Sequence, residues 1–240
     1  EPPSLMELQQ KLALLNRIEA LYDAYAGTLA LACRKGCHSC CTRNVTLTTL
    51  EAYRLLEGLS LEVSGPLLAR AAAQAGRNRF RPTVTTNQLA ELCLAGEDPP
   101  AEDADPAWGP CPLLTDAACP VYPLRPFGCR SFVSLRGCAQ IGCAEQTPLM
   151  VTVNTVFLQV IEHLDQTGCS GNFSDLLRVL APADARRAYR QGALGCGSNG
   201  LIRNRPVRIL MVPPEHQDPL RPWVARLQRL LHAAERPGPT

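Results

Sequence analysis

The segment from Glu97 to about Gln146 limits the fold most strongly, because its first half cannot form a regular helix or a central strand. Eight prolines lie between Pro99 and Pro126, and proline breaks helix interiors and removes a hydrogen-bond donor from a sheet. An irregular stretch of this length is uncommon in a compact domain unless something besides an apolar core organises it. Metal ligation is the obvious candidate, since the segment also carries Cys111, Cys119, Cys129, Cys138 and Cys143.

Helical patterns precede this segment. Apolar residues recur at helical spacing from Leu5 toward Leu31, after an S-x-x-E capping box that begins at Ser4. A second capping box begins at Thr48 and predicts a helix that runs until Gly58. Two further helices are predicted at about residues 65–76 and 85–96.

The chain returns to helical patterns after the proline-rich segment. A strong apolar helix is predicted from about Pro148 to Asp165, with shorter helices in FSDLLRVL and ADARRAYRQG and a closing one in RPWVARLQRLLHAA. Residues 206–212, with the sequence PVRILMV, form the one convincing strand, so any sheet should be small. The sequence therefore predicts a mostly α fold with a long irregular segment organised by metal.

The composition is that of an ordinary folded protein. Of the 240 residues 46% are hydrophobic and 19% are charged, and the formal net charge of +2 is too small to predict a nucleic-acid partner. No stretch approaches the roughly 20 consecutive apolar residues of a membrane helix, and the N-terminus lacks a signal-peptide pattern. We therefore expect a cytoplasmic protein without a membrane or nucleic-acid partner. We expect one domain over residues 1–240, with a metal-binding core at about 33–143 and a helical C-terminal part at about 147–240.

The stretch CRKGCHSCCT, residues 33–42, places four cysteines close together. Cys33, Cys37 and Cys40 stand at positions i, i+4 and i+7, which lie on one face of a helix, so their sulfur atoms can converge on one centre. Cys41 points elsewhere, and either completes the same centre through a turn or belongs to a second one. Three thiolates from so short a stretch would form most of a metal site.

Disulfide bonds are the competing explanation for the twelve cysteines of this chain. They fit poorly, because the chain is long enough to fold on its own core, shows no secretion signal, and contains the adjacent pair Cys40 and Cys41, which disulfide geometry disfavours. Cys93, Cys169 and Cys196 have no partner at ligand spacing, and are expected to be buried small apolar residues.

Three stretches of the sequence agree with one known pattern. They are C-x3-C-x2-C-C at residues 33–41, CPLL at Cys111, and CPVYPLRPFGCR from Cys119 to Arg130. Together they resemble the YkgJ-type cysteine-cluster family, described as zinc- or iron-chelating domains. The resemblance implies that the metal ligands are Cys33, Cys37, Cys40, Cys41, Cys111, Cys119 and Cys129. We add Cys138 as an eighth ligand, because it follows closely and makes two sets of four; Cys143 is its rival.

The spacing of the cysteines tilts the choice of metal toward an iron–sulfur cluster. Structural zinc sites usually combine two C-x2-C units, and only Cys37 and Cys40 have that spacing. A proline directly after a ligand cysteine, as at Cys111 and Cys119, recurs in iron–sulfur proteins. We therefore favour a [4Fe–4S] cluster over Zn²⁺. His38 is expected to be a solvated loop residue, while Arg125, Arg130 and Lys35 are expected to lower the thiolate pKa values.

Two kinds of enzyme share part of this pattern. Radical S-adenosylmethionine enzymes also use C-x3-C-x2-C, but they need an aromatic residue where Ser39 stands and a βα barrel. The flagellin lysine N-methylases have a similar cysteine cluster, and this more distant resemblance would imply methyl transfer from S-adenosylmethionine to a protein lysine. The only glycine-rich motif, GCGSNG at residues 195–200, does not lie between a strand and a helix, and is predicted to be a turn.

A redox, electron-transfer or oxygen-sensing module is the third possibility, because clustered thiolates or a cluster can exchange electrons. Its partner would be a redox protein, whereas a methylase would need a protein substrate; the sequence identifies neither. No catalytic residue is assigned, so the chain is not identified as an enzyme. Glu162, His163 and Asp165 are expected to form a solvated helix face.

Overall fold

Helices account for most of the regular structure in the computed structural model, which describes residues 5–34, 36–197 and 199–235. The predicted mostly α fold is confirmed. The described residues contain ten α-helices: α1 (Leu5–Ala26), α2 (Thr49–Glu57), α3 (Leu61–Ala73), α4 (Thr86–Ala95), α5 (Phe127–Arg130), α6 (Cys138–Ile141), α7 (Pro148–Leu164), α8 (Phe173–Leu180), α9 (Ala183–Arg190) and α10 (Gln217–Glu235). Short 3-10 turns lie at Pro106–Trp108, Tyr122–Leu124 and Pro214–His216.

Side-chain caps set several helix boundaries where the sequence predicts them. The Thr48 capping box starts α2, and Gly58 ends it. Thr85 caps α4, which stops at Gly96 in the left-handed conformation. The capping box predicted at Ser4 lies outside the described residues. Several boundaries differ from the prediction: α1 ends at Ala26, five residues before Leu31, α3 spans Leu61–Ala73 instead of 65–76, and α10 begins at Gln217 instead of residue 221.

The sheet is small, as predicted, but the predicted strand is not part of it. Three antiparallel strands, β1 (Thr46–Thr48), β2 (Cys169–Asn172) and β3 (Ile202–Arg203), lie in the order β1-β2-β3. The predicted strand at 206–212 is wrong, because this segment has no neighbouring strand and lies along α7 instead. The Gln159 side chain donates to the carbonyl of Ile209 at 2.8 Å and accepts from the amide of Met211 at 2.9 Å.

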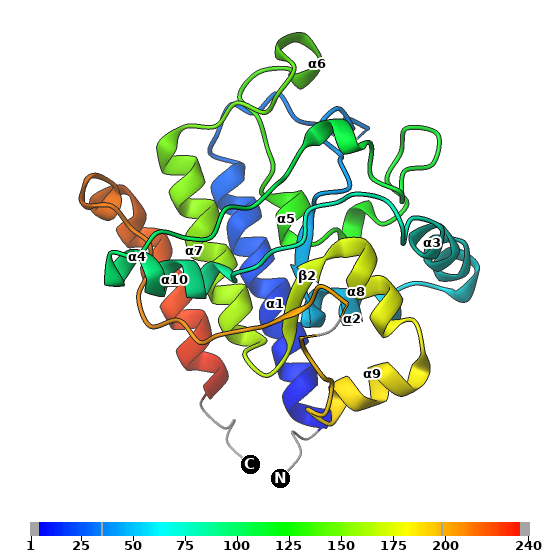
Figure 1. Ribbon diagram of the computed structural model, residues 1–240. Coiled ribbons are helices and arrows are strands. Elements are labelled where there is room, and N and C mark those ends of the chain that lie inside the picture. Colours follow the sequence, from blue (N-terminus) through cyan, green and yellow to red (C-terminus); the bar gives the residue numbers. More distant parts are fainter. Residues whose placement is uncertain (1–4, 35, 198, 236–240) are drawn as a thin grey trace.

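The core lies around α1 and α7, which run side by side through the centre of the molecule, with α10 against α1 (Figure 1). Tyr22 of α1 meets Phe127 of α5 and Phe157 of α7 edge-on, with ring centroids 4.8 and 5.4 Å apart. Leu113, Val121 and Phe127 of the proline-rich segment belong to the same buried apolar cluster. Part of that segment is therefore held by the core. Within the described ranges, no helix is both long and apolar enough to span a membrane.

Candidate metal centre

The first cysteine stretch is a loop, so the predicted helical face formed by Cys33, Cys37 and Cys40 is wrong. The helix before it ends at Ala26, ahead of Cys33, and Gly36 with a φ of 93° keeps the stretch out of helical conformation between Cys33 and Cys37. The loop is fixed by the chain near Ser134, whose carbonyl accepts from Ala32 at 2.9 Å and whose amide donates to the Cys33 sulfur at 3.2 Å. These contacts bring the loop beside α6, which begins at Cys138.

A second set of backbone contacts joins the same loop to the start of the proline-rich segment. The amide of Cys111 donates to the carbonyl of Cys41 at 2.8 Å, and the amide of Arg43 donates to the carbonyl of Gly109 at 3.2 Å. Thr42 and Pro110 form an isolated antiparallel bridge between them. Cys41 and Cys111, which are far apart in sequence, are therefore neighbours.

Four of the predicted ligands form a first thiol group, consisting of Cys33, Cys37, Cys40 and Cys138. Burial raises the pKa of Cys33, and charge on Cys138, Cys40 and Cys37 would raise it further. The pKa of Cys40 is also raised, first by its hydrogen bond with Cys41 and then by burial. The Cys40 sulfur also approaches the carbonyl of Phe132, 3.9 Å away.

Three other predicted ligands, Cys111, Cys119 and Cys129, form a second thiol group. Burial raises the pKa of each thiol, and the pKa of Cys129 is raised further by charge on the other two. The positive charge of Arg125 partly offsets this increase at Cys119 and Cys129, whose pKa values nevertheless stay raised. The Arg125 guanidinium is held 4.0 Å from the centre of the Tyr122 ring, and it donates to the Tyr122 carbonyl at 3.0 Å. Cys41 lies between the two groups. Its side chain is hydrogen-bonded to that of Cys40, and its carbonyl oxygen accepts from the Cys111 amide.

Glu51 positions the second thiol group. Its carboxylate closes the capping box of α2 by accepting from the Thr48 amide at 2.8 Å, and it accepts from the Phe127 amide at 2.7 Å. The latter bond fixes the start of α5, the helix that carries Cys129. Arg130, expected to act on the thiols, instead pairs with Asp23 at 2.6 Å and Glu19 at 3.2 Å.

The thiols are neighbours, but they do not form a closed site. In the described part of the chain, no three Cys, His, Asp or Glu side chains converge enough to hold a metal ion. The ligand set therefore stays a prediction. Cys143, the rival eighth ligand, is exposed, and its sulfur lies 3.8 Å from the carbonyl of Ile141. His38 is exposed, as expected, and Lys35 lies outside the described residues.

The expectation that Cys93, Cys169 and Cys196 are free, buried cysteines is wrong. Cys93 is exposed, and Cys169 and Cys196 form a disulfide bond with Cα atoms 5.9 Å apart. Cys169 begins β2, and Cys196 lies in the loop between α9 and β3. This pairing has no signal in the spacing of the cysteines, since it arises when β3 pairs with β2. The GCGSNG motif lies in the same loop, away from any strand–helix junction, and its described residues form turns and irregular backbone.

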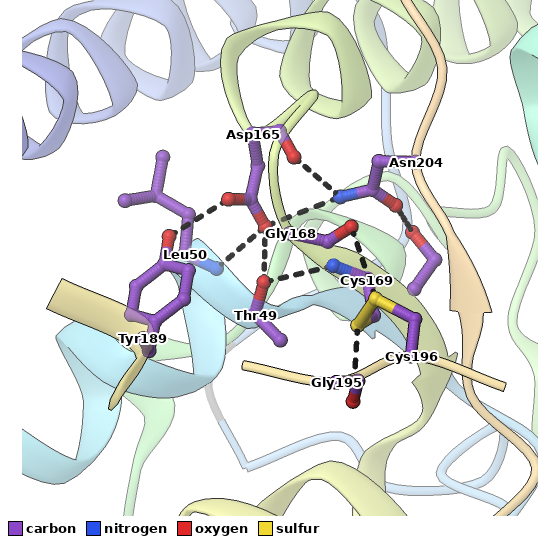
Figure 2. The surroundings of a disulfide bond; sticks show 10 residues. Thr49, Leu50, Asp165, Gly168, Cys169, Tyr189, Gly195, Cys196 and Asn204 are labelled. Atoms are coloured by element: carbon purple, nitrogen blue, oxygen red, sulfur yellow. Dashed lines mark hydrogen bonds between the residues drawn. A yellow bond between two sulfur atoms is a disulfide. The ribbon is translucent and has the colours of Figure 1, made fainter. Parts of the chain in front are cut away.

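Glu162 and Asp165 are buried, which corrects the expectation of a solvated helix face. Glu162 accepts from the amides of Asn87 and Arg205, both at 2.8 Å. Asp165 accepts from Tyr189, Thr49, Asn204 and the amide of Leu50, and the Thr49 oxygen accepts from the amide of Cys169 (Figure 2). Burial raises the pKa of Asp165 to about 6 despite these donors. The buried network thus extends from α7 to the disulfide.

No protein-family model, curated protein or solved structure matches the chain. The resemblance to the YkgJ-type family therefore stays a prediction.

Proposed function

We propose that the protein binds a metal centre through cysteine thiolates, and that this centre is an iron–sulfur cluster, [4Fe–4S] in preference to zinc. The observation that carries the proposal is that the Cys33–Cys41 loop is bonded to both ends of the cysteine-bearing segment, through Cys111 N to Cys41 O at 2.8 Å and Ser134 N to Cys33 Sγ at 3.2 Å. Soft thiolate donors gathered this way suit iron–sulfur clusters and zinc.

The arrangement of the thiols suggests how they would divide between two centres. Cys33, Cys37, Cys40 and Cys138 would serve one centre, since charge on the last three would raise the pKa of Cys33. Cys41 would join Cys111, Cys119 and Cys129 in the other, since its carbonyl is already bonded to Cys111. Each set contains four thiols, as a [4Fe–4S] cluster requires. Because the pKa values of Cys33, Cys40, Cys111, Cys119 and Cys129 are raised without metal, binding at these thiols would release protons and draw the loops together.

A bound cluster would supply one-electron chemistry. The chain would tune it through the Ser134 amide, which already donates to the Cys33 sulfur, and through the Arg125 guanidinium near Cys119. The surface position of Cys37 favours an electron-transfer or sensing role with a redox partner, because an exposed centre can exchange electrons with another protein. The methylase alternative stays a prediction.

Metal analysis of protein purified without oxygen tests the proposal. Iron with acid-labile sulfide and a broad visible absorption are expected, whereas zinc without colour would identify a zinc site. Cys138→Ser is expected to lose metal, but Cys93→Ser, a change of an exposed cysteine on α4, is expected to keep it. Protein without bound metal under all conditions, or unchanged metal content in both variants, would refute the proposed ligands.

A second comparison of variants tests whether Cys138 or Cys143 is the eighth ligand. Cys138 is buried and acts electrostatically on Cys33, while Cys143 is exposed. We therefore expect Cys143→Ser to retain the iron content of the unmodified protein, and Cys138→Ser to lose about half of it if two centres are present. The opposite result would assign Cys143 as the eighth ligand.

A further inference from the structure

A pocket lies beside the disulfide, at the junction of α4 and the chain around β3. Its volume is roughly 520 Å³, and the sulfur-bearing residue Cys196 forms part of its wall. The charged residues of the wall are Glu91, Arg203, Arg205 and Arg208. The pocket therefore combines a disulfide with a set of charged side chains that belong to neither thiol group.

The pocket carries an excess of positive charge, with three arginines against one glutamate. Both Glu91 oxygens are already engaged, one by Arg205 at 2.9 Å and the other by Arg208 at 3.3 Å. Arg203 is exposed, and its side chain has no ion pair or hydrogen bond with any other described residue. A small anion that enters this pocket would therefore be attracted by the Arg203 guanidinium.

The two residues of the disulfide differ in exposure. Cys169 is fully buried in β2, whereas Cys196 is partly exposed and lines the pocket. Thiol–disulfide exchange requires a thiolate to reach one of the sulfur atoms directly. Because Cys196 lines the pocket and Cys169 is buried, attack from the pocket is expected at Cys196, with Cys169 as the leaving group.

The reduced form of the pair would find acceptors already in place. The Cys169 sulfur lies 4.0 Å from the carbonyl oxygen of Gly195, and the Cys196 sulfur lies 3.5 Å from that of Gly168 (Figure 2). After reduction each thiol can donate to its neighbouring carbonyl, so breaking the bond leaves no buried S–H group without a partner.

We propose that this pocket receives a small anionic thiol that reduces the Cys169–Cys196 disulfide. Its thiolate attacks the Cys196 sulfur, the bond between the two cysteines breaks, and the Cys169 sulfur leaves with the electron pair and takes a proton from solvent. A second thiolate then attacks the sulfur of the small thiol in the mixed disulfide. Cys196 leaves as a thiolate and is protonated in turn. Two small thiols are oxidised to one disulfide, and the protein disulfide is reduced to two thiols.

Reduction would free the loop between α9 and β3. The disulfide closes a stretch with a sequence separation of 27, and it ties this loop to β2 beside the Asp165 network. Leu201 is buried, so it should hold the far end of the loop after reduction as well. Among the described residues, the change should therefore be confined to 191–197, 199 and 200. This proposal does not depend on the metal centre.

A charge series of small thiols tests the proposal. We would compare 2-mercaptoethanesulfonate, 2-mercaptoethanol and cysteamine, which are anionic, neutral and cationic, at equal thiolate concentrations and low salt. Alkylation followed by peptide mass spectrometry reports Cys169 and Cys196 separately from the other cysteines. We expect the anionic thiol to reduce the bond about fivefold faster than the cationic one, with the difference lost at high salt.

A pair of arginine variants tests whether Arg203 causes the preference for the anionic thiol. Arg203→Gln should reduce the preference for the anionic thiol, while Arg17→Gln, a change of an exposed arginine on α1, should leave it intact. The mixed disulfide should be trapped on the Cys196 peptide. Equal rates for the three thiols, reduction only in denaturant, or an adduct on Cys169 would each overturn the proposal.

Discussion

At Gly168 the backbone passes so close to the Asp165 carboxylate and the Thr49 hydroxyl that a side chain would overlap both. The carboxylate and the hydroxyl are buried and hydrogen-bonded to one another, so neither can move aside without losing hydrogen bonds. Glycine is needed here for space, and the same residue supplies the carbonyl that faces the Cys196 sulfur.

Gly168→Ala should therefore lower the free energy of unfolding by on the order of 2–4 kcal/mol, because the new methyl group overpacks a buried polar site. Gly76→Ala is the control, since an added Cβ atom there meets nothing within 4 Å. Urea denaturation of the three proteins gives the comparison. Equal stability of the Gly168 variant and the unmodified protein would show that the loop yields at little cost.

Asp165 should make stability fall as the pH rises. Its pKa is raised from the usual 3.8 to about 6 in the folded protein, so the folded state binds the proton more tightly than the unfolded state between these values. The stabilisation is fully present below pH 3.8, and its loss by pH 7 amounts to about 3 kcal/mol. In Asp165→Asn this dependence is absent, so the stability gap between the unmodified protein and the variant should shrink from pH 4 to pH 7. A gap independent of pH would contradict the raised pKa.

At the scale of elements, one carboxylate joins α2 to the short helix α5. Glu51 caps the first and accepts from Phe127 at the start of the second. Arg79 and Asp175 form a comparable buried link at 2.5 Å, which ties the chain after α3 to α8. Burial alone would raise the pKa of Asp175, but its hydrogen bonds with Arg79 and Arg81 lower it below its usual value. In each case a buried carboxylate on one helix fixes a neighbouring stretch, the start of α5 or the loop around Arg79.

Glu51→Ala should loosen the part of the chain that carries Cys129. The variant loses the capping box and leaves the Phe127 amide without its acceptor, at a cost of on the order of 2–3 kcal/mol. Limited proteolysis should cut near α5 faster in this variant than in Glu62→Ala, which changes an exposed glutamate in the first turn of α3. Identical cleavage in both variants would show that the core alone holds α5.

At the scale of the whole molecule, the helical core holds the middle of the proline-rich segment more firmly than the cysteine-bearing stretches on either side. The aromatic contacts of Tyr22, Phe127 and Phe157 join the core to the middle of the proline-rich segment. The stretches on either side, near Cys111 and Cys138, are joined to the Cys33–Cys41 loop by few backbone hydrogen bonds. Metal would therefore stabilise the flanks of this segment more than its middle.

Removal of metal should accordingly raise hydrogen exchange in residues 108–120 and 132–146, while residues 121–130 stay protected by the core. Cys37→Ser, which removes a proposed ligand at an exposed position, should have the same effect. Mass spectrometry of exchanging protein with and without metal measures it. Uniform protection in both states would mean that metal does not organise the segment.

The sequence alone predicted the helices that carry their own local signals. Caps at Thr48 and Thr85 and a stop at Gly96 involve residues a few positions apart, so they could be identified without the fold. The candidate ligands came from a family resemblance, with Cys138 added from its position. The helical face assumed for the first stretch was wrong, because α1 ends at Ala26 and Gly36 adopts a positive φ.

Tertiary structure alone decided the features that join distant parts of the chain. The Cys169–Cys196 disulfide, the burial of Glu162 and Asp165, and the irregular path of residues 206–212 all depend on partners outside the local segment. Acidic residues on a helix predict a solvent-exposed face when the rest of the fold is unknown. A segment with the composition of a strand forms one only where an adjacent strand can pair with it. Local sequence specifies the hydrogen bonds within a helix, whereas a buried polar group or a disulfide is specified only by what the fold places beside it.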